Sequence, residues 1–588
     1  MCGIVGYIGN KQAQPILLDC LTRLEYRGYD SSGIAVRDTD ITVCKDAVRV
    51  SVLENQAPTI QGNSGIAHTR WATHGAPTLN NAHPHLDCTG KFAVVHNGVI
   101  SNYQTLRQQL IAEGHRFISE TDTEVIPHLI EKYYTGSIEN AVKAALTLLE
   151  GSYAIVVLSQ YEPKLVVARK GSPLVIGIGK DEIYIASDVP AIASYTSKVI
   201  YMEDGDLGVI TADAILITRN GEKVDRKEQQ VIWTKEDLGK NGFEHFMLKE
   251  IHEEPKVIRN TIIENSGLEN MFATGKSVQD LLILACGTSY NAGLIGEYLI
   301  EEILGIQTRV AFGSEFNHRR AIYPNEAIVI TQSGETADIL TAMNNLQAAH
   351  VKVLAISNVY GSTASRQAEG NVYIKAGPEV SVAATKSFVA QLIALYLLVL
   401  SHPNVSPAMR KELTLELKLL PITVERMFDM VPQIEGCAAY LAKQENAFYI
   451  GRGINYPIAL EGALKLKEIS YIHAEGYAAG ELKHGPLALI SKGVPVIAIV
   501  AKDGNYESMI TSIKEVKARD AYVIALIDEK DDAIANLVDV VIKVPHTHAL
   551  LSPVVNVIPL QLLAYYTAKL RNCPIDFPRN LAKSVTVE

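Results

Sequence analysis

The chain has 588 residues, a net charge of -11 at pH 7 and a hydrophobic fraction of 47%. A chain of this length exceeds what one hydrophobic core supports, so we expect several domains of roughly 100 to 200 residues each. The negative charge argues against nucleic acid as a partner, because binding to a phosphate backbone depends on clustered lysine and arginine.

Membrane insertion and secretion are also disfavoured. The apolar stretch "FVAQLIALYLLVL" (388–400) is shorter than the roughly 20 residues of a membrane span and contains Gln391, so it predicts a buried helix. The N-terminus lacks the basic and apolar regions of a signal peptide. Seven cysteines without CxxC spacing are typical of a reducing compartment. We therefore expect a cytoplasmic protein.

Residues 1–222 predict a sheet-rich α+β domain. Short apolar runs of strand type, such as "GIVGYI", "FAVVH" and "YAIVVL", alternate with two helical stretches near 102–113 and 123–150. The densely charged segment 223–257 then differs in composition, and we expect it to be a linker.

From residue 258 onward, a strand, turn and helix pattern occurs twice. Gly287 and Tyr290 in "ILACGTSY" match Gly453 and Tyr456 in "IGRGINY" at an offset of 166 residues. "VKVLAIS" and "NVYIKA" match "AYVIALI" and "DVVIKV" at offsets of 170 and 168 residues. A period this long indicates a duplicated domain. Alternating strands and helices predict a doubly wound parallel sheet in each copy. The expected segments are the copies at 258–415 and 430–575, and a tail at 576–588.

Cys2 is a candidate nucleophile. Removal of Met1 would place an α-amino group, with a pKa near 7.7 to 8.0, on the same residue as a thiol with a pKa near 8.5. The amine can then accept the thiol proton. A small buried apolar residue at the start of a strand is the alternative for Cys2.

Polar residues near the ends of later strands complement such a nucleophile. In "VVHNGVISN", the Asn97 amide and the Gly98 N–H can stabilise an oxyanion, although an asparagine-glycine pair also favours a simple tight turn. Arg70 and Asp122 offer the opposite charges that bind the zwitterion of an amino acid.

The segment "HPHLDC" brings His83, His85, Asp87 and Cys88 close in sequence. Zinc sites usually show more regular pairs of ligands, and Pro84 restrains the first two residues here. We therefore expect no metal site. No cofactor is expected either, because "GRGINY" is only a fragment of a dinucleotide-binding fingerprint, with Tyr456 in place of its third glycine.

The motifs "CGIVGYIG", "AHTRWATHG", "NAHPH", "HNGVISN" and "ETDTEV" together resemble the class II glutamine amidotransferase domain. This resemblance implies an N-terminal nucleophile hydrolase fold with sandwiched antiparallel sheets, in which Cys2 attacks the amide of glutamine. It implies oxyanion donors at Asn97 and Gly98. The glutamine-binding residues that it implies are Arg70, Thr73, His74, His83 and Asp122.

In the repeated half, "AIVITQSGETADIL" places hydroxyl groups and glycine between a strand and a helix. Thr331, Gln332, Ser333 and Thr336 would bind an anion together with backbone N–H groups of the helix N-terminus. "ACGTSY" forms a similar turn with Thr288 and Ser289. No lysine-containing phosphate loop of the nucleotide type is present, so a phosphomonoester fits better than a nucleoside triphosphate. An ordinary helix cap is the alternative for either loop.

Glu461, Lys465 and Glu468 recur at helical spacing and are expected on one helix face. A solvated face with routine ion pairs is the alternative. The glycine-rich "EGYAAGELKHGP" that follows offers Lys483 and His484 in a loop, where binding residues tend to lie.

These segments and the tail "LAKSVTVE" resemble the sugar isomerase (SIS) domains of the glucosamine-6-phosphate synthase family, over the whole chain. The resemblance implies glutamine and fructose 6-phosphate as substrates. It implies a Schiff base at Lys583, ring opening by His484 and proton transfer by Glu468, with Lys465 beside it. The sugar phosphate would then be bound by Thr288, Ser289, Thr331, Gln332, Ser333, Thr336, Val382, Glu461 and Ala582. It further implies an ammonia channel gated by Trp71 and a homodimer in which His484 reaches the neighbour's site.

One residue departs from the family pattern. Where relatives read "VASTK", this chain has "VAATK", with Ala384 in place of a serine expected to contact the sugar. Losing one hydroxyl contact costs about 1 kcal/mol of binding. We therefore expect a raised KM for the sugar phosphate.

Other functions are conceivable for these motifs. A glutamine phosphoribosyltransferase shares the first domain, but "IALIDEKDDAIA" lacks the hydroxyl and glycine turn of a diphosphate site. A relative that aminates another sugar phosphate remains open. A noncatalytic sugar-phosphate sensor is disfavoured by the set of reactive residues just described.

Overall fold

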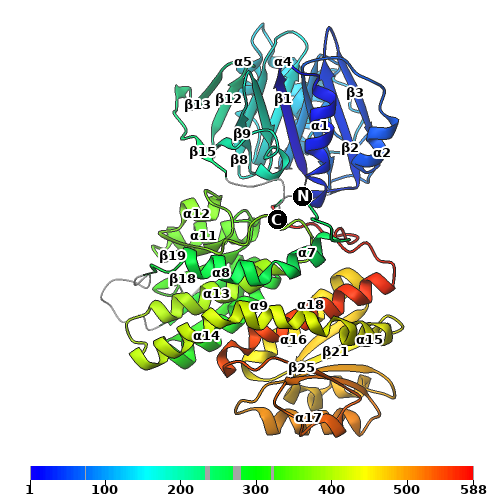
Figure 1. Ribbon diagram of the computed structural model, residues 1–588. Coiled ribbons are helices and arrows are strands. Elements are labelled where there is room, and N and C mark those ends of the chain that lie inside the picture. Colours follow the sequence, from blue (N-terminus) through cyan, green and yellow to red (C-terminus); the bar gives the residue numbers. More distant parts are fainter. Residues whose placement is uncertain are drawn as a thin grey trace. The chain divides into compact units, whose positions relative to one another are not determined.

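Strands in the first part of the chain pair antiparallel, whereas strands in the second part pair parallel. The computed structural model describes residues 2–72, 74–231, 237, 239–268, 280–318 and 323–586. It divides into two compact units, which we call the N-terminal unit (Met1–Gly239 with Ser584–Glu588) and the C-terminal unit (Lys240–Lys583). Figure 1 colours them from blue to green and from green to red.

The N-terminal unit contains two antiparallel sheets. The first has eight strands in the order β15-β11-β9-β10-β1-β4-β2-β3, and the second has seven in the order β14-β13-β12-β8-β7-β6-β5. The strands of the first sheet are β1 (Gly3–Gly9), β2 (Ser31–Arg37), β3 (Ile41–Asp46), β4 (Ser64–Arg70), β9 (Val175–Ile178), β10 (Glu182–Ala186), β11 (Lys198–Tyr201) and β15 (Gln229–Gln230). Those of the second are β5 (His85–Leu86), β6 (Phe92–Ile100), β7 (Gly151–Ser159), β8 (Leu165–Lys170), β12 (Asp206–Ile210), β13 (Ile215–Arg219) and β14 (Glu222–Lys223).

The two sheets of this unit face one another across a shared apolar core. Ile4 and Ile66 of the first sheet and Val95 and Val156 of the second belong to one buried cluster. The helices are α1 (Ala13–Thr22), α2 (Val50–Gln56), α3 (Tyr103–Ala112), α4 (Val125–Tyr133) and α5 (Ile138–Leu146), with 3-10 turns η1 (Glu25–Arg27) and η2 (Val189–Ala191). Helix α1 packs on β1 and β4, whereas α3, α4 and α5 share a core with the outer face of the second sheet. This sandwich confirms the predicted fold class.

The helices of this unit differ in detail from expectation. The stretch 123–150 forms two helices, because the chain turns at Gly136 and Ser137 begins α5 by accepting a hydrogen bond from the Asn140 N–H. Helices α1 and α2 were not predicted. Both are short, and their apolar residues resemble the strand-like runs around them.

The C-terminal unit contains two parallel five-stranded sheets with the same topology. Their orders, β17-β16-β18-β19-β20 and β22-β21-β23-β24-β25, both correspond to 2-1-3-4-5. The first sheet contains β16 (Asp280–Ala285), β17 (Gln307–Phe312), β18 (Glu326–Thr331), β19 (Lys352–Ser357) and β20 (Gly370–Tyr373). The second contains β21 (Asn446–Gly451), β22 (His473–Ala478), β23 (Pro495–Val500), β24 (Tyr522–Asp528) and β25 (Val540–Val544). The identical strand order confirms the duplication and the doubly wound fold.

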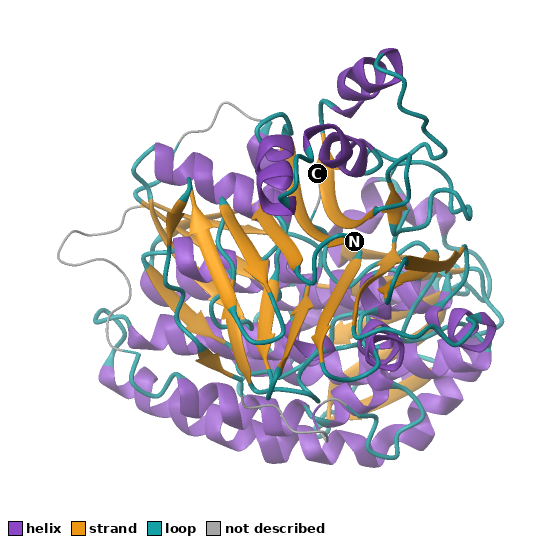
Figure 2. Ribbon diagram, turned by 90° about the horizontal axis from the view of Figure 1, so that it is seen from above, coloured by secondary structure: helices purple, strands orange, loops and turns teal. Residues whose placement is uncertain are grey.

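Helices flank these sheets, as the contacts of α9 with β16 and of α11 with β19 show. Figure 2 distinguishes the helices (purple) from the strands (orange) of the whole chain. They are α7 (Phe246–His252), α8 (Glu254–Glu264), α9 (Thr288–Leu304), α10 (Gly313–Asn317), α11 (Ala337–Ala348), α12 (Thr363–Gln367), α13 (Lys386–Ser401), α14 (Pro407–Glu425), α15 (Val431–Leu441), α16 (Tyr456–Ser470), α17 (Tyr506–Lys517) and α18 (Ser552–Leu570). Short 3-10 turns are η3 (Arg426–Met430), η4 (Gly453–Asn455), η5 (Ala479–His484), η6 (Pro486–Leu489), η7 (Ala535–Leu537) and η8 (Ala549–Leu551).

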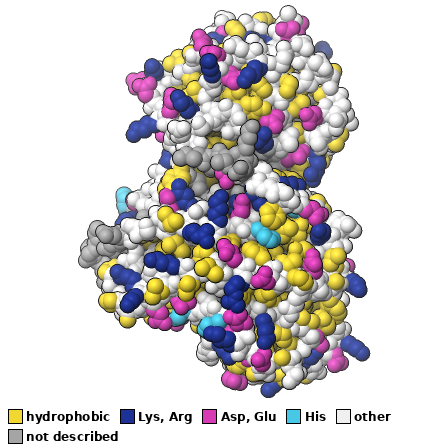
Figure 3. All heavy atoms as spheres, in the orientation of Figure 1, with side chains coloured by type: hydrophobic (Ala, Val, Ile, Leu, Met, Phe, Trp, Pro, Cys, Tyr) yellow, Lys and Arg dark blue, Asp and Glu magenta, His cyan; other side chains and the backbone are white. Residues whose placement is uncertain are grey.

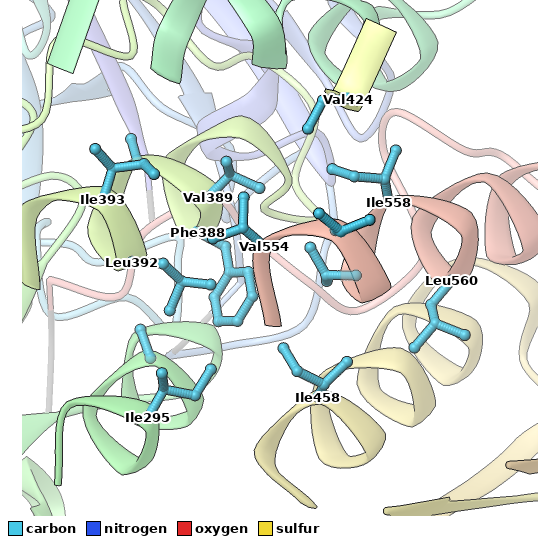
Figure 4. Close-up of a cluster of buried hydrophobic side chains, with 14 of the residues drawn as sticks. Ile295, Phe388, Val389, Leu392, Ile393, Val424, Ile458, Val554, Ile558 and Leu560 are labelled. Atoms are coloured by element: carbon cyan, nitrogen blue, oxygen red, sulfur yellow. The ribbon is translucent and has the colours of Figure 1, made fainter. Parts of the chain in front are cut away.

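The core between the two repeats is formed by helices. Figure 4 shows Phe388 of α13 surrounded by Ile295 of α9, Ile458 of α16 and Val554 of α18. These side chains are fully buried. The predicted helix at 388–400 is therefore confirmed as a core helix. Among the described residues, Ala549–Leu570 is the one helix long and apolar enough to cross a membrane, and 83% of its apolar window is buried inside the protein.

Segments expected at the edges of domains are more structured than predicted. Residues 223–257 were expected to be a linker, yet α7 and the start of α8 lie there, and Met247 and Ile251 are buried in the core. The first two N–H groups of α7 donate to the Asp576 carboxylate at 2.9 and 3.0 Å. The charged residues on either side of α7 therefore concealed a packed helix, whose short apolar run FML is followed by Ile251.

The surface drawn in Figure 3 shows lysine and arginine interspersed with aspartate and glutamate. That face carries no broad basic patch of the kind that binds nucleic acid.

Candidate active sites

Cys2 lies directly before β1, a central strand of the first sheet of the N-terminal unit. Its Sγ accepts a hydrogen bond from the Trp71 N–H at 3.4 Å and lies 3.6 Å from the Trp71 carbonyl oxygen. Trp71 follows β4, which pairs with β1 through Gly3 and Thr69. The strand pairing therefore fixes the thiol beside the end of β4. Met1 lies outside the described residues.

Asn97 and Gly98 lie in β6 of the facing sheet. The Asn97 Nδ2 donates to the Cys2 carbonyl oxygen at 2.9 Å, and its Oδ1 lies 3.1 Å from the Nε2 of His68. Gly98 has φ of 130°, and a Cβ there would come within 2.1 Å of the Ser152 carbonyl oxygen, so only glycine fits. The structure therefore brings the predicted oxyanion donor next to the predicted nucleophile.

Arg70 and Asp122 are also brought together. The Arg70 guanidinium donates to the backbone carbonyls of His74, Gly75 and Ala76, which orders the loop after β4. Burial lowers the pKa of Arg70, whereas Cys2, Asp122 and Asp30 act in the opposite direction. Asp122 accepts the Ile100 N–H at 2.8 Å. Cys2 and the Asp122 carboxylate thus both lie near the Arg70 cation, and binding of a free amino acid requires opposite charges of this kind.

The three remaining residues predicted to contact glutamine are Thr73, His74 and His83, and the structure places His74 and His83 in different surroundings. His74 is half-buried, with its ring edge toward Tyr103. His83 is only 4% exposed and stacks on His68 with ring centroids 4.0 Å apart. His83 therefore lies behind Asn97, and its contact with the site runs through His68. Thr73 lies outside the described residues.

A cluster of four buried histidines supports the oxyanion donor. His83 accepts the His96 N–H at 3.4 Å, and His85 lies edge-on to His83 and bonds to Thr121. Burial lowers the pKa of all four, to about 3 for His68. They are therefore neutral near pH 7. The sequence analysis missed His68 and His96, although both lie close to predicted site residues. His68 lies two residues before Arg70 on β4, and His96 lies directly before Asn97 on β6.

The predicted anion site of the C-terminal unit lies where the strand order of the first parallel sheet reverses, between β16 and β18. Ligands of doubly wound sheets bind outside the carboxyl ends of the strands at this point. Thr288 and Ser289 begin α9 after β16. The Ser289 hydroxyl accepts from the buried Gln391 amide at 2.9 Å.

The loop after β18 is ordered by its own hydroxyl groups. Thr331 and Thr336 are linked by a 2.9 Å hydrogen bond, and the Thr331 hydroxyl accepts the Gly334 N–H. The Ser333 hydroxyl accepts the Glu335 N–H at 3.1 Å, and the Gln332 carbonyl accepts the Asn358 N–H. Helix α11 begins directly afterwards, so its free N–H groups lie at this loop.

Glu461, Lys465 and Glu468 lie on one face of α16, as their spacing predicted. The Lys465 Nζ lies 3.4 Å from Glu461 and 2.7 Å from Glu468. It also donates to the Thr288 hydroxyl at 3.0 Å, and Glu461 accepts from the Thr288 hydroxyl and the Asn291 amide. Glu461 and Lys465, which belong to the second repeat, thus contact the predicted sugar-phosphate site of the first repeat.

The charges in this network are buried. Burial raises the pKa of Glu461, and Lys465 opposes that effect. For Lys465, burial lowers the pKa but the two carboxylates outweigh it and raise it. A solvated helix face is therefore excluded for these residues, since Glu461 and Lys465 are both 0% exposed.

Lys583 is buried, although it lies five residues from the C-terminus. Its Nζ lies 2.5 Å from the Glu379 carboxylate, which also accepts hydrogen bonds from Thr385 and Ser387. Burial raises the pKa of Glu379, but Lys583 outweighs this and lowers it to about 2. Nearby, the Val382 N–H donates to the Asp576 carbonyl, and Ala582 is half-buried. The C-terminal tail thus packs against residues 379–382 of the first repeat.

His484 differs from the other predicted residues. It ends η5 on the surface and is exposed, and within the described residues its side chain makes no hydrogen bond or ion pair. This chain by itself therefore does not bring His484 to the network around Lys465.

Comparisons with known proteins agree with this division. A model of the SIS domain family matches residues 276–401 and 440–571, and a model of the glutamine amidotransferase domain matches residues 68–194. The glutamine–fructose-6-phosphate aminotransferases (isomerizing) of Methanosarcina acetivorans and Caldanaerobacter subterraneus are each 48% identical, over 100% of this chain and of theirs. The C-terminal domain of glucosamine-fructose-6-phosphate aminotransferase from Francisella tularensis is 36% identical, with a TM-score of 0.54, over 58% of this chain and 100% of that one.

Proposed function

The chain belongs to the family of glutamine–fructose-6-phosphate aminotransferases (isomerizing), and we propose on that premise how its residues carry out the reaction. The protein transfers the amide nitrogen of glutamine to fructose 6-phosphate, giving glucosamine 6-phosphate and glutamate. One observation carries the assignment of the first half-reaction: the Asn97 amide lies 2.9 Å from the Cys2 carbonyl oxygen, held by His68.

In the N-terminal unit, the Cys2 thiolate attacks the side-chain amide of glutamine. After removal of Met1, the α-amine of Cys2 accepts the thiol proton and later delivers it to the leaving ammonia. Asn97 and the Gly98 N–H stabilise the oxyanion of the tetrahedral intermediate. Water then hydrolyses the thioester to release glutamate. Arg70 binds the α-carboxylate of glutamine, and Asp122 binds its α-ammonium group. Thr73 and His74 complete the surroundings of the bound glutamine, and His83 supports Asn97 through His68.

In the C-terminal unit, the hydroxyl-rich loop Thr331–Thr336 and Ser289 bind the phosphate. Backbone N–H groups at the start of α11 add to this binding. Thr288, Glu461, Val382 and Ala582 surround the sugar. No metal ion is required by this arrangement, since neutral hydroxyl groups and N–H groups suffice for a phosphomonoester.

Lys583 forms a Schiff base with the C2 carbonyl of the open-chain sugar. Its nitrogen must lose a proton and separate from Glu379 before it can attack, so substrate binding has to weaken the 2.5 Å ion pair. Ammonia then displaces the lysine nitrogen. Glu468 removes a proton from C1 and returns one to C2, which converts the ketose imine to the aldose amine. Lys465, 2.7 Å away, forms an ion pair with the Glu468 carboxylate and holds it in place.

Further assignments follow from family resemblance. Ammonia passes from Cys2 to the sugar through a channel closed to water, with Trp71 as the gate. The enzyme acts as a homodimer in the cytoplasm, and the exposed His484 opens the sugar ring in the neighbouring subunit. The exposure of His484 is consistent with a partner that completes its surroundings.

Product analysis tests the proposal. Purified protein is supplied with glutamine and fructose 6-phosphate, and Cys2→Ala is supplied with either glutamine or ammonia. The variant is expected to lose only the glutamine-dependent formation of glucosamine 6-phosphate. Glutamate without an amino sugar from the wild type would show that the C-terminal unit uses another acceptor.

A further inference from the structure

Four side chains with metal-binding atoms lie close together in the N-terminal unit. Cys88 follows β5, His115 follows α3, and His128 and Glu131 lie three positions apart on α4. One ligand atom from each lies within 4.8 Å of all the others. None of these four residues has a role in the proposed reaction.

Four of the six distances between these atoms lie close to the edge lengths of a tetrahedral metal site. The Cys88 Sγ lies 3.7 Å from the His115 Nδ1 and 3.5 Å from the His128 Nδ1. The Glu131 Oε2 lies 3.0 and 3.5 Å from the same two nitrogens. With Zn–S near 2.3 Å and Zn–N and Zn–O near 2.1 Å, tetrahedral angles require separations of about 3.4 to 3.6 Å. Little movement is needed to accommodate an ion.

Hydrogen bonding alone explains the arrangement of these four side chains less well than metal binding does. Both imidazoles direct the same atom, Nδ1, at one thiol and one carboxylate oxygen, and a single N–H cannot be well aligned with both acceptors. The Cys88 sulfur also accepts the Arg116 N–H at 3.3 Å, and the Glu131 oxygen faces the Cys88 N–H at 3.2 Å. Backbone donors of this kind stabilise a thiolate and a carboxylate that bind a metal.

A second carboxylate lies behind one of the histidines. His128 is 1% exposed, and its Nε2 faces the Glu124 Oε1 at 3.8 Å. Glu124 is itself fixed by the Ile118 N–H and by the N–H and hydroxyl of Ser119. At 3.8 Å this contact is electrostatic and longer than a hydrogen bond. A carboxylate on this side of the ring favours the tautomer that carries the proton on Nε2 and leaves Nδ1 free.

The sequence segment "HPHLDC" explains why the site was not recognised. His83 and His85 of that segment lie in the buried histidine cluster, whereas Cys88 meets side chains 27, 40 and 43 positions away. The expectation of no metal site was based on the ligands within this segment and did not consider partners elsewhere in the chain.

We propose that Cys88, His115, His128 and Glu131 bind one Zn²⁺ ion as a structural site. A thiolate with two imidazoles and a carboxylate is a donor set that suits zinc. Four protein ligands leave no open position for substrate, so the ion has a structural rather than a catalytic part. Binding releases the thiol proton, because the thiolate is the ligand.

The position of the site indicates what the ion stabilises. It joins the turn between β5 and β6 to the end of α3 and to α4. Strand β6 carries Asn97 and Gly98, and the loop before α4 carries Asp122. Zinc would therefore hold together the segments that frame the glutamine site, and its loss would loosen them.

The test uses the full-length protein, stripped of metal by a chelator and titrated with Co²⁺ under reducing conditions. One Co²⁺ per chain is expected, with the visible bands of tetrahedral cobalt and a near-ultraviolet thiolate-to-cobalt band, both lost on addition of Zn²⁺. Cys88→Ser should abolish the thiolate band, and Glu131→Gln should weaken Co²⁺ binding at least tenfold. Cys44→Ser, which removes a half-buried thiol elsewhere in the same unit, should bind as the wild type does.

A thermal measurement accompanies the titration. Zn²⁺ should raise the unfolding midpoint of the wild type and of Cys44→Ser, but not that of Cys88→Ser. The proposal is overturned if the wild type binds less than one tenth of an equivalent of Co²⁺ or Zn²⁺, or if Cys88→Ser and Glu131→Gln bind as the wild type does. Should Cys88→Ser fail to fold, the Glu131→Gln titration decides on its own.

Discussion

The ammonium group of Lys583 lies 2.5 Å from a carboxylate oxygen of Glu379, and the two side chains are 4% and 0% exposed. An amine in such an ion pair carries a proton and cannot attack a carbonyl. The pair therefore keeps the proposed nucleophile inactive and in place until the sugar enters. Glu379 in turn is fixed by the N–H groups of Thr385 and Ser387.

Lys583→Arg separates the charge of this residue from its nucleophilicity. The guanidinium retains an ion pair with Glu379 but cannot form an imine. Amino-sugar formation should fall by at least about 10³-fold with either glutamine or ammonia, whereas hydrolysis of glutamine continues. Borohydride should add a sugar-phosphate mass to the wild type in the presence of fructose 6-phosphate and none to the variant. An adduct of equal yield on the variant would assign the Schiff base to another lysine.

Glu379→Gln tests the stability of the same pair. The folded-state pKa of Glu379 is about 2, below its ordinary value of 4.5. Its contribution to stability is therefore present above about pH 4.5 and lost as the pH falls toward 2. At pH 7 the variant should be less stable by about 3 to 5 kcal/mol, since it leaves a buried charge unpaired. Calorimetric unfolding should show this difference shrinking between pH 4.5 and the lowest pH at which the protein refolds. If the difference in unfolding free energy between the wild type and the variant did not depend on pH, the ion pair between Glu379 and Lys583 would contribute little to stability.

Asn97→Ala removes the proposed oxyanion donor. The glutamine-dependent rate should fall by about 10² to 10³-fold, whereas the ammonia-dependent rate stays unchanged. Asn140→Ala, at an exposed position of α5, is the matched control. Steady-state measurement of glutamate and glucosamine 6-phosphate distinguishes the two rates. Equal loss of both would indicate that the substitution disturbs the fold instead of the chemistry.

Ala384→Ser restores the hydroxyl that relatives are expected to have at this position. Ala384 is half-buried directly before Thr385, whose N–H is fixed by Glu379. One added hydrogen bond is worth about 1 kcal/mol, so the KM for fructose 6-phosphate should fall about fivefold with little change in kcat. An unchanged or higher KM would show that this side chain does not face the sugar.

The four buried histidines make the stability of the N-terminal unit depend on pH. Their folded-state pKa values are lowered by burial, so between pH 6.5 and the folded values the unfolded chain binds more protons than the folded one. Stability should therefore decrease as the pH falls below about 6.5. Trp71 lies in this unit and reports its unfolding by fluorescence.

His85→Gln removes one of these titrating groups while leaving a partner for Thr121. The slope of the unfolding free energy with pH should then decrease by up to about 1.4 kcal/mol per pH unit. A flat stability profile between pH 7 and 4.5 in the wild type, or an unchanged slope in the variant, would contradict this account.

Local patterns were sufficient to predict the fold class and part of the site. Alternating apolar residues identified strands, and offsets near 168 residues identified the two equivalent sheets that the structure contains. Glu461, Lys465 and Glu468 were placed on one helix face because the helical period is a local property. Cys2, Asn97, Arg70 and Asp122 were selected by residue type in strands and loops. The pairing of β1 with β4, the Asn97 hydrogen bond from the facing sheet and the Asp122 hydrogen bond to Ile100 bring them together.

Burial and long-range partners were not predictable in this way. The structure buries His83 behind His68, pairs Lys583 with Glu379 across 204 positions, and packs α7 within a segment expected to be a linker. It also gives Cys88 partners outside its own motif.

The amino-acid sequence by itself determined the periodicity of the elements, the duplication and the reactive side-chain types, because these depend on residues close together in the chain. Which charged groups are buried together was decided by the tertiary structure, because the electrostatic partner of a buried side chain is chosen by how the sheets and helices pack.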